Sequence, residues 1–183
     1  MDRNFIRIDS TSIYLSPLRV DEKAIETYTK WMANPEVNKW IGKNNSVCTY
    51  QNECEWANRN HDEIRFNIIL KKKYSAFKED TLIGNCSIKV SNRNGTLGIC
   101  IGEQIGQNHG YGTETIKMLI KFGFEELNLH AINLQLIADN KRAYKCYLKA
   151  GFKECGRTRE CYYYEGHYSD VIHMDILKSE YFN

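Results

Sequence analysis

The stretch that decides the fold is residues 101–112, IGEQIGQNHGYG, which runs directly into an amphipathic pattern at residues 113–127, TETIKMLIKFGFEEL. The apolar residues of the second segment fall on one helical face, so the pattern predicts a helix of about four turns. Backbone N–H groups in the first turn of such a helix have no intrahelical partner, and Gly106, Gly110 and Gly112 allow them to converge on one oxygen. The stretch therefore predicts either a tight strand-to-helix turn or a cradle for a phosphate group.

The spacing of the loop residues distinguishes this loop from two known classes of phosphate-binding loop. The loop has neither a GxGxxG fingerprint after an early strand nor a GxxxxGK sequence followed by Ser or Thr. It has instead the pattern QxxGxG, from Gln107 to Gly112, and a second segment at 140–152, NKRAYKCYLKAGF, combines an Asn cap, a helical pattern and a closing Gly-Phe. Together these segments resemble the coenzyme A-binding motifs of the GNAT acetyltransferases. Residues 14–42 and 158–177 resemble the branch of that family that contains the ribosomal-protein N-terminal acetyltransferases.

The remaining periodicity agrees with the fold that this resemblance implies. Three successive strands joined by turns imply antiparallel pairing, and the strand, helix, strand, helix succession after them implies a crossover. The predicted class is α+β in three layers, with a mixed, mostly antiparallel twisted sheet flanked by helices, in a single domain over residues 1–183. The pattern predicts strands at 12–18, 65–71, 81–90, 96–102, 132–136, 152–165 and 169–177, and helices at 24–32, 50–59, 113–127 and 141–150.

The composition restricts the function classes. With 25 Lys plus Arg against 23 Asp plus Glu, the net charge of +2 would attract neither nucleic acid nor an anionic membrane, so neither is expected as a partner. Seven cysteines form no CxxC pair and are odd in number, which disfavours a disulfide framework, and His167 and His173 match no common zinc spacing. The amino terminus lacks a leader pattern and no apolar run reaches membrane-spanning length. These features predict a cytoplasmic monomer or homodimer without metal.

The resemblance implies acetyl-coenzyme A as the cosubstrate and assigns its contacts. The loop would hold the diphosphate, and a backbone N–H within residues 99–101 would polarise the thioester carbonyl. Asn140 would contact the pantetheine arm as well as cap its helix, although capping alone explains an Asn there. Tyr144 stands where an aliphatic residue is commoner in the family. The implied cofactor-binding residues are Ile99, Cys100, Ile101, Gln107, Asn108, His109, Gly110, Tyr111, Gly112, Thr113, Asn140 and Tyr144.

Acetyl transfer to an amine needs a neutral amine, a polarised carbonyl and a proton for the departing thiolate. The resemblance implies Glu103 as the general base, acting through water, and Tyr147 as the acid that protonates the coenzyme A sulfur. Each has a plainer interpretation: Glu103 as a solvated carboxylate, Tyr147 as a core residue. Cys100 and Cys146 raise the alternative of an acetylated thiol, but no His or Asn partner is recognisable, and buried apolar cysteines are the better interpretation.

The acceptor amine is the least determined part of the interpretation. A protein amino terminus is favoured over a polyamine or an aminoglycoside, which would need several carboxylates such as Glu103, Glu160, Glu165 and Asp170. A non-catalytic acyl-coenzyme A sensor would keep the loop but need neither Glu103 nor Tyr147. The predicted substrate-binding residues are Trp31, Trp40, Glu165 and Asp170.

Overall fold

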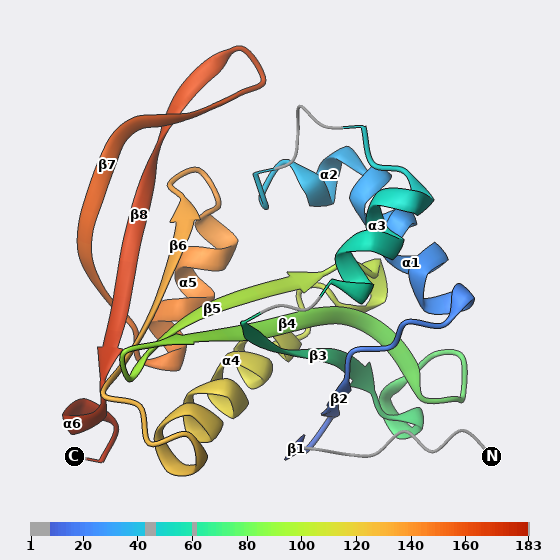
Figure 1. The fold of residues 1–183 in the computed structure, drawn as a ribbon, viewed down its shortest axis with the longest axis horizontal. Coiled ribbons are helices and arrows are strands. Elements are labelled where there is room, and N and C mark those ends of the chain that lie inside the picture. Colours follow the sequence, from blue (N-terminus) through green and yellow to red (C-terminus); the bar gives the residue numbers. More distant parts are fainter. Residues whose placement is uncertain (1–7, 43–46, 60–61, 183) are drawn as a thin grey trace.

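The structure, a computed structural model, describes residues 8–42, 47–59 and 62–182. Its centre is one eight-stranded sheet with the strand order β1-β2-β3-β4-β5-β6-β8-β7 (Figure 1). Every neighbouring pair is antiparallel except β5 and β6, which run parallel. The predicted mixed, mostly antiparallel sheet is therefore confirmed.

The predicted strands and helices occur in the predicted order. The structure adds several short strands, helices and turns that the sequence analysis did not predict. The strands are β1 (Ile8–Asp9), β2 (Ile13–Pro17), β3 (Glu63–Leu70), β4 (Thr81–Ser91), β5 (Asn94–Ile101), β6 (Ala131–Ile137), β7 (Lys153–Tyr164) and β8 (His167–Leu177). The helices are α1 (Glu22–Ala33), α2 (Pro35–Asn38), α3 (Tyr50–Asn58), α4 (Tyr111–Lys121), α5 (Lys141–Ala150) and α6 (Lys178–Tyr181), with the short turns η1 (Lys72–Tyr74), η2 (Gln104–Gly106) and η3 (Phe122–Glu126).

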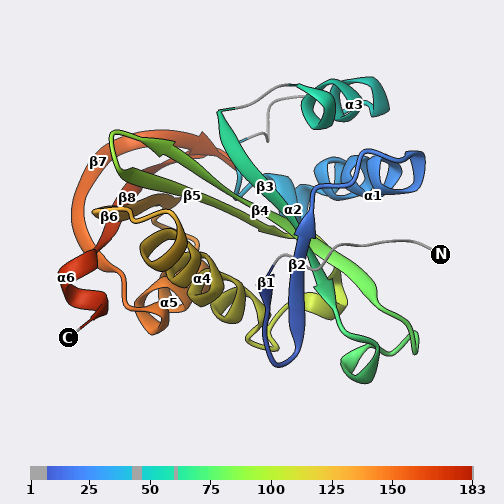
Figure 2. The same ribbon diagram turned by 60° about the horizontal axis from the view of Figure 1, so that its bottom comes forward.

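The helices cover both faces of the sheet and create two cores. Figure 2 shows α1, α2 and α3 on one face, and α4 and α5 on the other. The larger core lies beneath α4 and α5 and includes the fully buried Ile68, Ile116 and Leu119. The smaller core lies beneath α1 to α3 and includes Ile25 and Tyr28, both fully buried. Burial of these apolar faces is what stabilises the three layers.

The predicted helices begin at or two residues before the predicted positions, and one of them ends differently. Asp21 caps α1, and Asn140 caps α5 by accepting a 3.0 Å hydrogen bond from the Ala143 amide. The predicted helix over 113–127 stops being an α-helix at Lys121 and continues as the π-helical turn η3. Within this turn, a Cβ on Gly123 would lie 2.7 Å from Cδ1 of Ile132, so the chain packs closely against β6 there.

The parallel pair β5 and β6 separates soon after it forms. The two strands pair only over Asn94–Thr96 and Ala131–Asn133. Beyond these residues the strands diverge in a V, which is plain in Figure 1. Their carboxyl-terminal halves therefore face each other with main-chain groups that do not pair across the gap, within the described residues.

The β7–β8 hairpin forms the far edge of the sheet and reaches back toward the amino-terminal helices. The hydroxyl of Tyr162 donates a 3.1 Å hydrogen bond to the carbonyl of Lys39, just after α2. The Lys39 ammonium lies 3.3 Å from a carboxylate oxygen of Glu165 at the hairpin tip. These contacts connect the hairpin to α2 on the far side of the V.

Candidate active site

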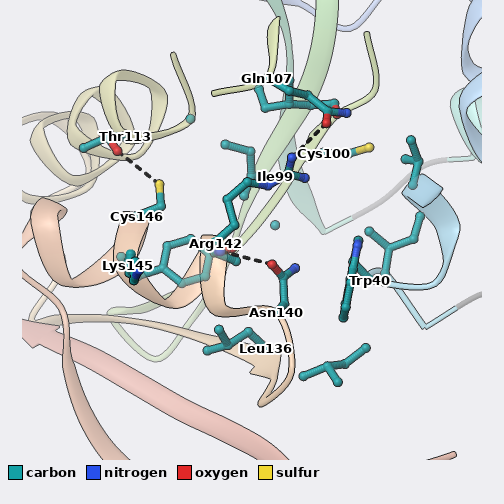
Figure 3. A pocket seen from close by; sticks show the side chains of 18 of the residues that line it. Trp40, Ile99, Cys100, Gln107, Thr113, Leu136, Asn140, Arg142, Lys145 and Cys146 are labelled. Carbon is teal, nitrogen blue, oxygen red and sulfur yellow. Dashed lines mark hydrogen bonds between the residues drawn. The ribbon is translucent and has the colours of Figure 1, made fainter. Parts of the chain in front are cut away.

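A cleft of about 620 Å³ occupies the opening between β5 and β6. It extends from the loop before α4, across the V, to the segment after α2, and Figure 3 shows Trp40 on the opposite side from Cys146. Pockets that hold drug-sized ligands measure about 300 to 1,000 Å³. The cleft is therefore large enough for an elongated ligand that passes through the sheet.

The first turn of α4 forms one end of the cleft. Gly110 caps the helix in the left-handed conformation, with φ of +86°, and Asn108 is also left-handed, with φ of +64°. Because glycine has no side chain to cap the helix, the amides of the first turn stay available to an anion. Gly112 also lines the cleft, and a Cβ there would meet Cys146 Sγ at 3.6 Å and Ile101 Cγ1 at 4.0 Å, both ordinary contact distances. Folding alone thus does not demand glycine at 112.

Basic residues of α5 lie along the same end of the cleft. Arg142, Lys145 and Lys149 all line it, and Arg142 donates a 2.8 Å hydrogen bond to the side-chain oxygen of Gln107. The amide nitrogen of Gln107 donates in turn to the Ile101 carbonyl at 3.2 Å. Gln107 thereby connects the loop to both β5 and α5. Three cations beside a helix amino terminus make this end attractive to a phosphate group.

The middle of the cleft is lined by main-chain groups of β5. The Gly102 amide donates to the Ile83 carbonyl of β4 at 3.0 Å. Because successive residues of a strand direct their N–H groups to opposite edges, those of Ile99 and Ile101, beyond the last residues that pair with β6, point away from β4 toward the open edge. The cleft thus has a row of amide donors along one wall.

The opposite wall has the same character. The Ala138 amide donates to the Asp170 carbonyl at 2.8 Å, which continues the pairing of β6 with β8. Alternation along β6 then directs the main-chain groups of Gln135 and Ile137 toward β5. An extended ligand with its own amides can hydrogen-bond to both strand edges.

Tyr147 of α5 lies between the two walls. Its side chain lines the cleft although the residue is only 8% exposed, and burial holds the pKa of its phenol well above the ordinary value. Among the described residues its hydroxyl has no hydrogen-bond partner. The adjacent Cys146 thiol accepts a 3.3 Å hydrogen bond from Thr113 (Figure 3), and burial raises its pKa also. Tyr147 is therefore a protonated donor, and Cys146 is a thiol rather than a thiolate.

The far end of the cleft combines aromatic rings with a single carboxylate. Trp40 and Tyr162 line it, and the Trp40 ring packs edge-on against Tyr164 with 5.7 Å between centroids. Of the described residues that line the cleft, Glu36 is the only Asp or Glu. Its carboxylate already pairs with the Lys39 ammonium at 3.1 Å. This end is suited to a ligand with little charge.

The structure brings most of the sequence-predicted residues to this cleft but not all of them. The cleft is lined by Trp40, Ile99, Cys100, Ile101, Gln107, Asn108, Gly110, Gly112, Thr113, Asn140 and Tyr147. Seven predicted residues lie outside its lining: Trp31, Glu103, His109, Tyr111, Tyr144, Glu165 and Asp170.

Two of these outlying residues bond to each other. The indole N–H of Trp31 donates to a carboxylate oxygen of Glu103 at 2.9 Å. Trp31 is 3% exposed, and a Cβ on Gly102 would lie 2.1 Å from its ring, so the indole fits tightly over the end of β5. The role of Glu103 as the base stays a prediction, and any contact with the reacting amine needs an intervening water.

The other outlying residues have partners on the surface. Tyr144 donates to Glu154 at 3.1 Å, and His109 stacks on Tyr111 with 5.7 Å between centroids. Asp170 accepts a 3.0 Å hydrogen bond from the Glu160 amide. Glu165 is paired with Lys39, as described above. The wall of several carboxylates that a polycationic acceptor would need is thus not assembled in the cleft from the described residues.

Other classes of site are also limited by the described residues. These contain no group of three or more His, Cys, Asp or Glu placed to hold a metal ion. None of the seven cysteines is in a disulfide. In the part of the chain that the structure describes, no helix is both long and apolar enough to cross a membrane.

Comparison with protein families now identifies the chain. The model of the acetyltransferase (GNAT) domain matches residues 12–153. The chain belongs to the GNAT acetyltransferase family. Both segments on which the resemblance to this family was based fall within this match, so the predicted family is confirmed.

The names of relatives in this family refer to different acceptors. The chain is 31% identical over 121 residues to the uncharacterized N-acetyltransferase p20 of Bacillus licheniformis, covering 64% of each chain. It is 36% identical over 77 residues to the spermidine N(1)-acetyltransferase of Vibrio cholerae, covering 42% of this chain and 44% of that one. It is 28% identical over 89 residues to the putative ribosomal N-acetyltransferase YdaF of Bacillus subtilis, covering 49% and 48%. The matches thus span less than two thirds of each relative.

The fold is shared with solved GNAT structures. A crystal structure of spermidine N-acetyltransferase from Vibrio cholerae in complex with CoA and spermine superposes with a TM-score of 0.78 at 23% identity, covering 95% of this chain and 100% of that one. At this identity the likeness shows the fold and not the acceptor.

Sequence reasoning missed residues at both ends of the cleft. Arg142, Lys145 and Lys149 repeat at three and four along α5, a cationic stripe that the sequence analysis did not single out. Glu36 and Tyr162 carry no local signal, because the first follows a proline and the second lies in a tyrosine-rich strand. Only the closure of the hairpin onto α2 brings these two residues to one site.

Proposed function

We propose that this protein transfers an acetyl group from acetyl-coenzyme A to a primary amine. The observation that carries the proposal is the alignment of the open amide edge of β5 with the uncapped first turn of α4 in one cleft. The first offers hydrogen bonds to a thioester arm, and the second offers them to a diphosphate. The lack of any disulfide agrees with a reducing compartment, which we propose is the cytoplasm.

Residues at different positions along the cleft would have different roles. The amides of Tyr111, Gly112 and Thr113 would hold the diphosphate with help from Arg142. The Ile99 amide would donate to the thioester carbonyl, where negative charge develops as the amine attacks. Tyr147 would donate its proton to the departing sulfur, since its raised pKa keeps the phenol protonated at neutral pH.

The acceptor that we favour is the amino terminus of a protein or peptide. A polyamine or an aminoglycoside carries several positive charges and needs several carboxylates around it. The described lining of the cleft supplies only Glu36. The similarity to a spermidine acetyltransferase keeps a small amine as the second candidate, and a non-catalytic sensor of acyl-coenzyme A as the third.

The test is coenzyme A release from acetyl-coenzyme A with a panel of acceptors. The panel contains an Ala- or Ser-starting peptide, spermidine and an aminoglycoside. Coenzyme A should be measured by chromatography, because the exposed Cys155 and Cys161 would react with thiol dyes. Calorimetry with coenzyme A provides the binding reference.

The outcomes separate the three candidates. Faster release with the peptide than with spermidine supports the favoured acceptor, and the reverse order supports a small amine. Tight binding of coenzyme A with no release for any amine would indicate a sensor. No binding at all would contradict the whole proposal.

A further inference from the structure

Three basic side chains follow one face of α5 where this helix borders the cleft. Arg142, Lys145 and Lys149 line the cleft and recur at spacings of three and four residues, so they lie in one row along the helix. Cys146 belongs to the same row, and its thiol accepts a 3.3 Å hydrogen bond from Thr113 of α4. The row is therefore on the side of α5 that is turned toward α4, and Figure 3 shows Lys145 beside Cys146 in this part of the cleft.

The row is longer than a diphosphate alone requires. From Arg142 to Lys149 the helix rises about 10 Å. Arg142 is at the amino-terminal end of the row and contacts the loop before α4 through Gln107, at 2.8 Å. It therefore lies beside the uncapped first turn of α4, the proposed site of the diphosphate. Lys145 and Lys149 extend the positive charge from there toward the carboxyl end of α5.

These two lysines have no anionic partner in the part of the chain that the structure describes. Both are exposed, and neither forms an ion pair or a side-chain hydrogen bond there. Of the described residues that line the cleft, the only Asp or Glu is Glu36, which belongs to α2 on the other side of the V (Figure 1). Two like charges one helical turn apart repel each other, so the pair does not stabilise the helix. Its charge is available to a ligand.

The charge of the row acts inside the cleft. Burial raises the pKa of the Cys146 thiol, whereas the positive charges of Lys149 and Arg142 act to lower it. Both cations are thus close enough to influence a charge at this buried position. The whole chain has a net charge of only +2, so the row is a local concentration of charge and not part of a broad basic surface for nucleic acid.

We infer that Lys145 and Lys149 bind the phosphate group on the ribose of coenzyme A. The inference rests on the proposed function and names a specificity determinant of the same cleft. Coenzyme A carries a diphosphate and, separately, a phosphate monoester at the 3′ position of its ribose. A phosphate monoester carries about two negative charges at neutral pH, which two ammonium groups one helical turn apart can balance. The diphosphate keeps the amides of α4 and the guanidinium of Arg142.

The two lysines would select the complete coenzyme over related carriers of an acyl thioester. Dephospho-coenzyme A has the same diphosphate and the same pantetheine arm but lacks the ribose phosphate. A pantetheine arm attached to a carrier protein lacks the nucleotide altogether. Both would keep the hydrogen bonds of the arm to the strand edges and lose the contacts with Lys145 and Lys149. The donor class is therefore a free coenzyme A thioester with its 3′-phosphate.

The experiment measures the Kd of coenzyme A and of dephospho-coenzyme A by calorimetry. The unmodified protein should bind coenzyme A at least about tenfold more tightly than the dephospho form. The double variant Lys145→Gln/Lys149→Gln should bind coenzyme A at least about tenfold more weakly than the unmodified protein does. Its Kd for dephospho-coenzyme A should stay within about threefold of the unmodified value, because the diphosphate contacts remain.

The matched control is the double variant Lys121→Gln/Lys153→Gln. It removes the same two charges from outside the cleft, where the ammonium groups pair with Glu125 and Glu180 respectively. This control should keep the full preference for coenzyme A over the dephospho form.

Each result decides for or against the inference. Equal affinity of the unmodified protein for the two ligands would overturn it without any variant. An equal loss of both ligands in the Lys145→Gln/Lys149→Gln variant would mean that the lysines act on the diphosphate, and a similar loss of preference in the control would reduce the effect to net charge. If the double variant does not fold, Lys145→Gln and Lys149→Gln are tested singly, each with an expected loss of at least about threefold in coenzyme A affinity. If the unmodified protein binds neither ligand, the proposed function itself fails.

Discussion

The two faces of the sheet are built differently. Beneath α4 and α5 the buried side chains are mostly apolar, and the buried hydroxyls among the described residues there are those of Tyr147 and of Thr115, which donates to the Tyr111 carbonyl at 2.8 Å. Beneath α1 to α3 a polar row crosses four paired strands, formed by Ser16, Asn67, Asn85 and Cys100. The first face packs tightly, and the second carries polar groups where packing alone would favour apolar ones.

The two faces would suit different kinds of ligand contact. A coenzyme can be held by main-chain amides of a strand edge and a helix end, and these leave the side chains free to pack. An acceptor amine needs polar or charged side chains, which must be buried beside it. The polar row accordingly leaves Ser16 Oγ and Asn67 Nδ2 without a hydrogen bond among the described residues.

The largest effect should come from the hydroxyl on the apolar face. Tyr147→Phe removes the proposed acid and should lower kcat about a hundredfold, while the Kd for coenzyme A stays within about twofold. Tyr144→Phe on the same helix is the control, because its hydroxyl bonds to Glu154 outside the cleft. Equal kcat for both variants would mean that the Tyr147 hydroxyl is not the acid, and that only main-chain groups on this side of the sheet contribute to catalysis.

The main-chain contribution can be tested at Gly112. Gly112→Val places branches over the first-turn amides of α4 and should weaken coenzyme A binding at least about tenfold by calorimetry. Gly112→Ala should stay within about threefold, because its Cβ would make only ordinary contacts, with Cys146 at 3.6 Å and Ile101 at 4.0 Å. Equal affinities for the two variants would place the diphosphate elsewhere.

Glu103 is the base predicted from sequence, and the effect of its substitution on kcat can be compared with that of Tyr147→Phe. Its carboxylate accepts the Trp31 indole N–H at 2.9 Å and does not line the cleft, so Glu103→Gln should lower kcat by less than about fivefold. The measurement is the pH profile of kcat. A hundredfold loss together with the disappearance of the acidic limb would establish Glu103 as the base.

The polar face should be more sensitive in stability than in catalysis. Tyr28 donates a 2.6 Å hydrogen bond to the buried Asn67, and Tyr28→Phe would leave that amide oxygen unsatisfied. We expect a loss of about 1 to 3 kcal/mol in the free energy of unfolding by urea, with coenzyme A affinity unchanged. Tyr181→Phe, which loses a surface bond to Glu125, should lose less than about 0.5 kcal/mol. Similar losses for both would mean that the polar row is solvated.

The smallest effect concerns the hairpin that bounds the cleft. The Asp139 carboxylate 3.1 Å away raises the pKa of His167, and His167 lowers the pKa of Asp139. The stabilisation from His167 is complete below its unfolded pKa and is lost as pH rises through the folded value. His167→Gln should therefore lower the thermal midpoint near about pH 5.5 and leave it unchanged near about pH 9. A pH-independent difference, or the same profile for His130→Gln, would exclude this ion pair.

Sequence determined the elements and the starts of α4 and α5 because both depend on local patterns. Apolar periodicity, the Asn140 cap and the glycines of the loop act over a few residues, and the structure agrees with them. The π-helical turn η3, in which Gly123 packs closely on Ile132, cannot be told from a continued α-helix by apolar periodicity.

Only the tertiary structure decided which side chains are buried together. Glu53 looks like any polar residue of a short amphipathic helix, and its burial depends on α3 packing over β3 to β5. The opening of β5 from β6 likewise comes from strand pairing that ends at Thr96, although nothing in the local sequence stops it there. Local free-energy preferences thus specify the elements, whereas long-range packing determines which side chains meet.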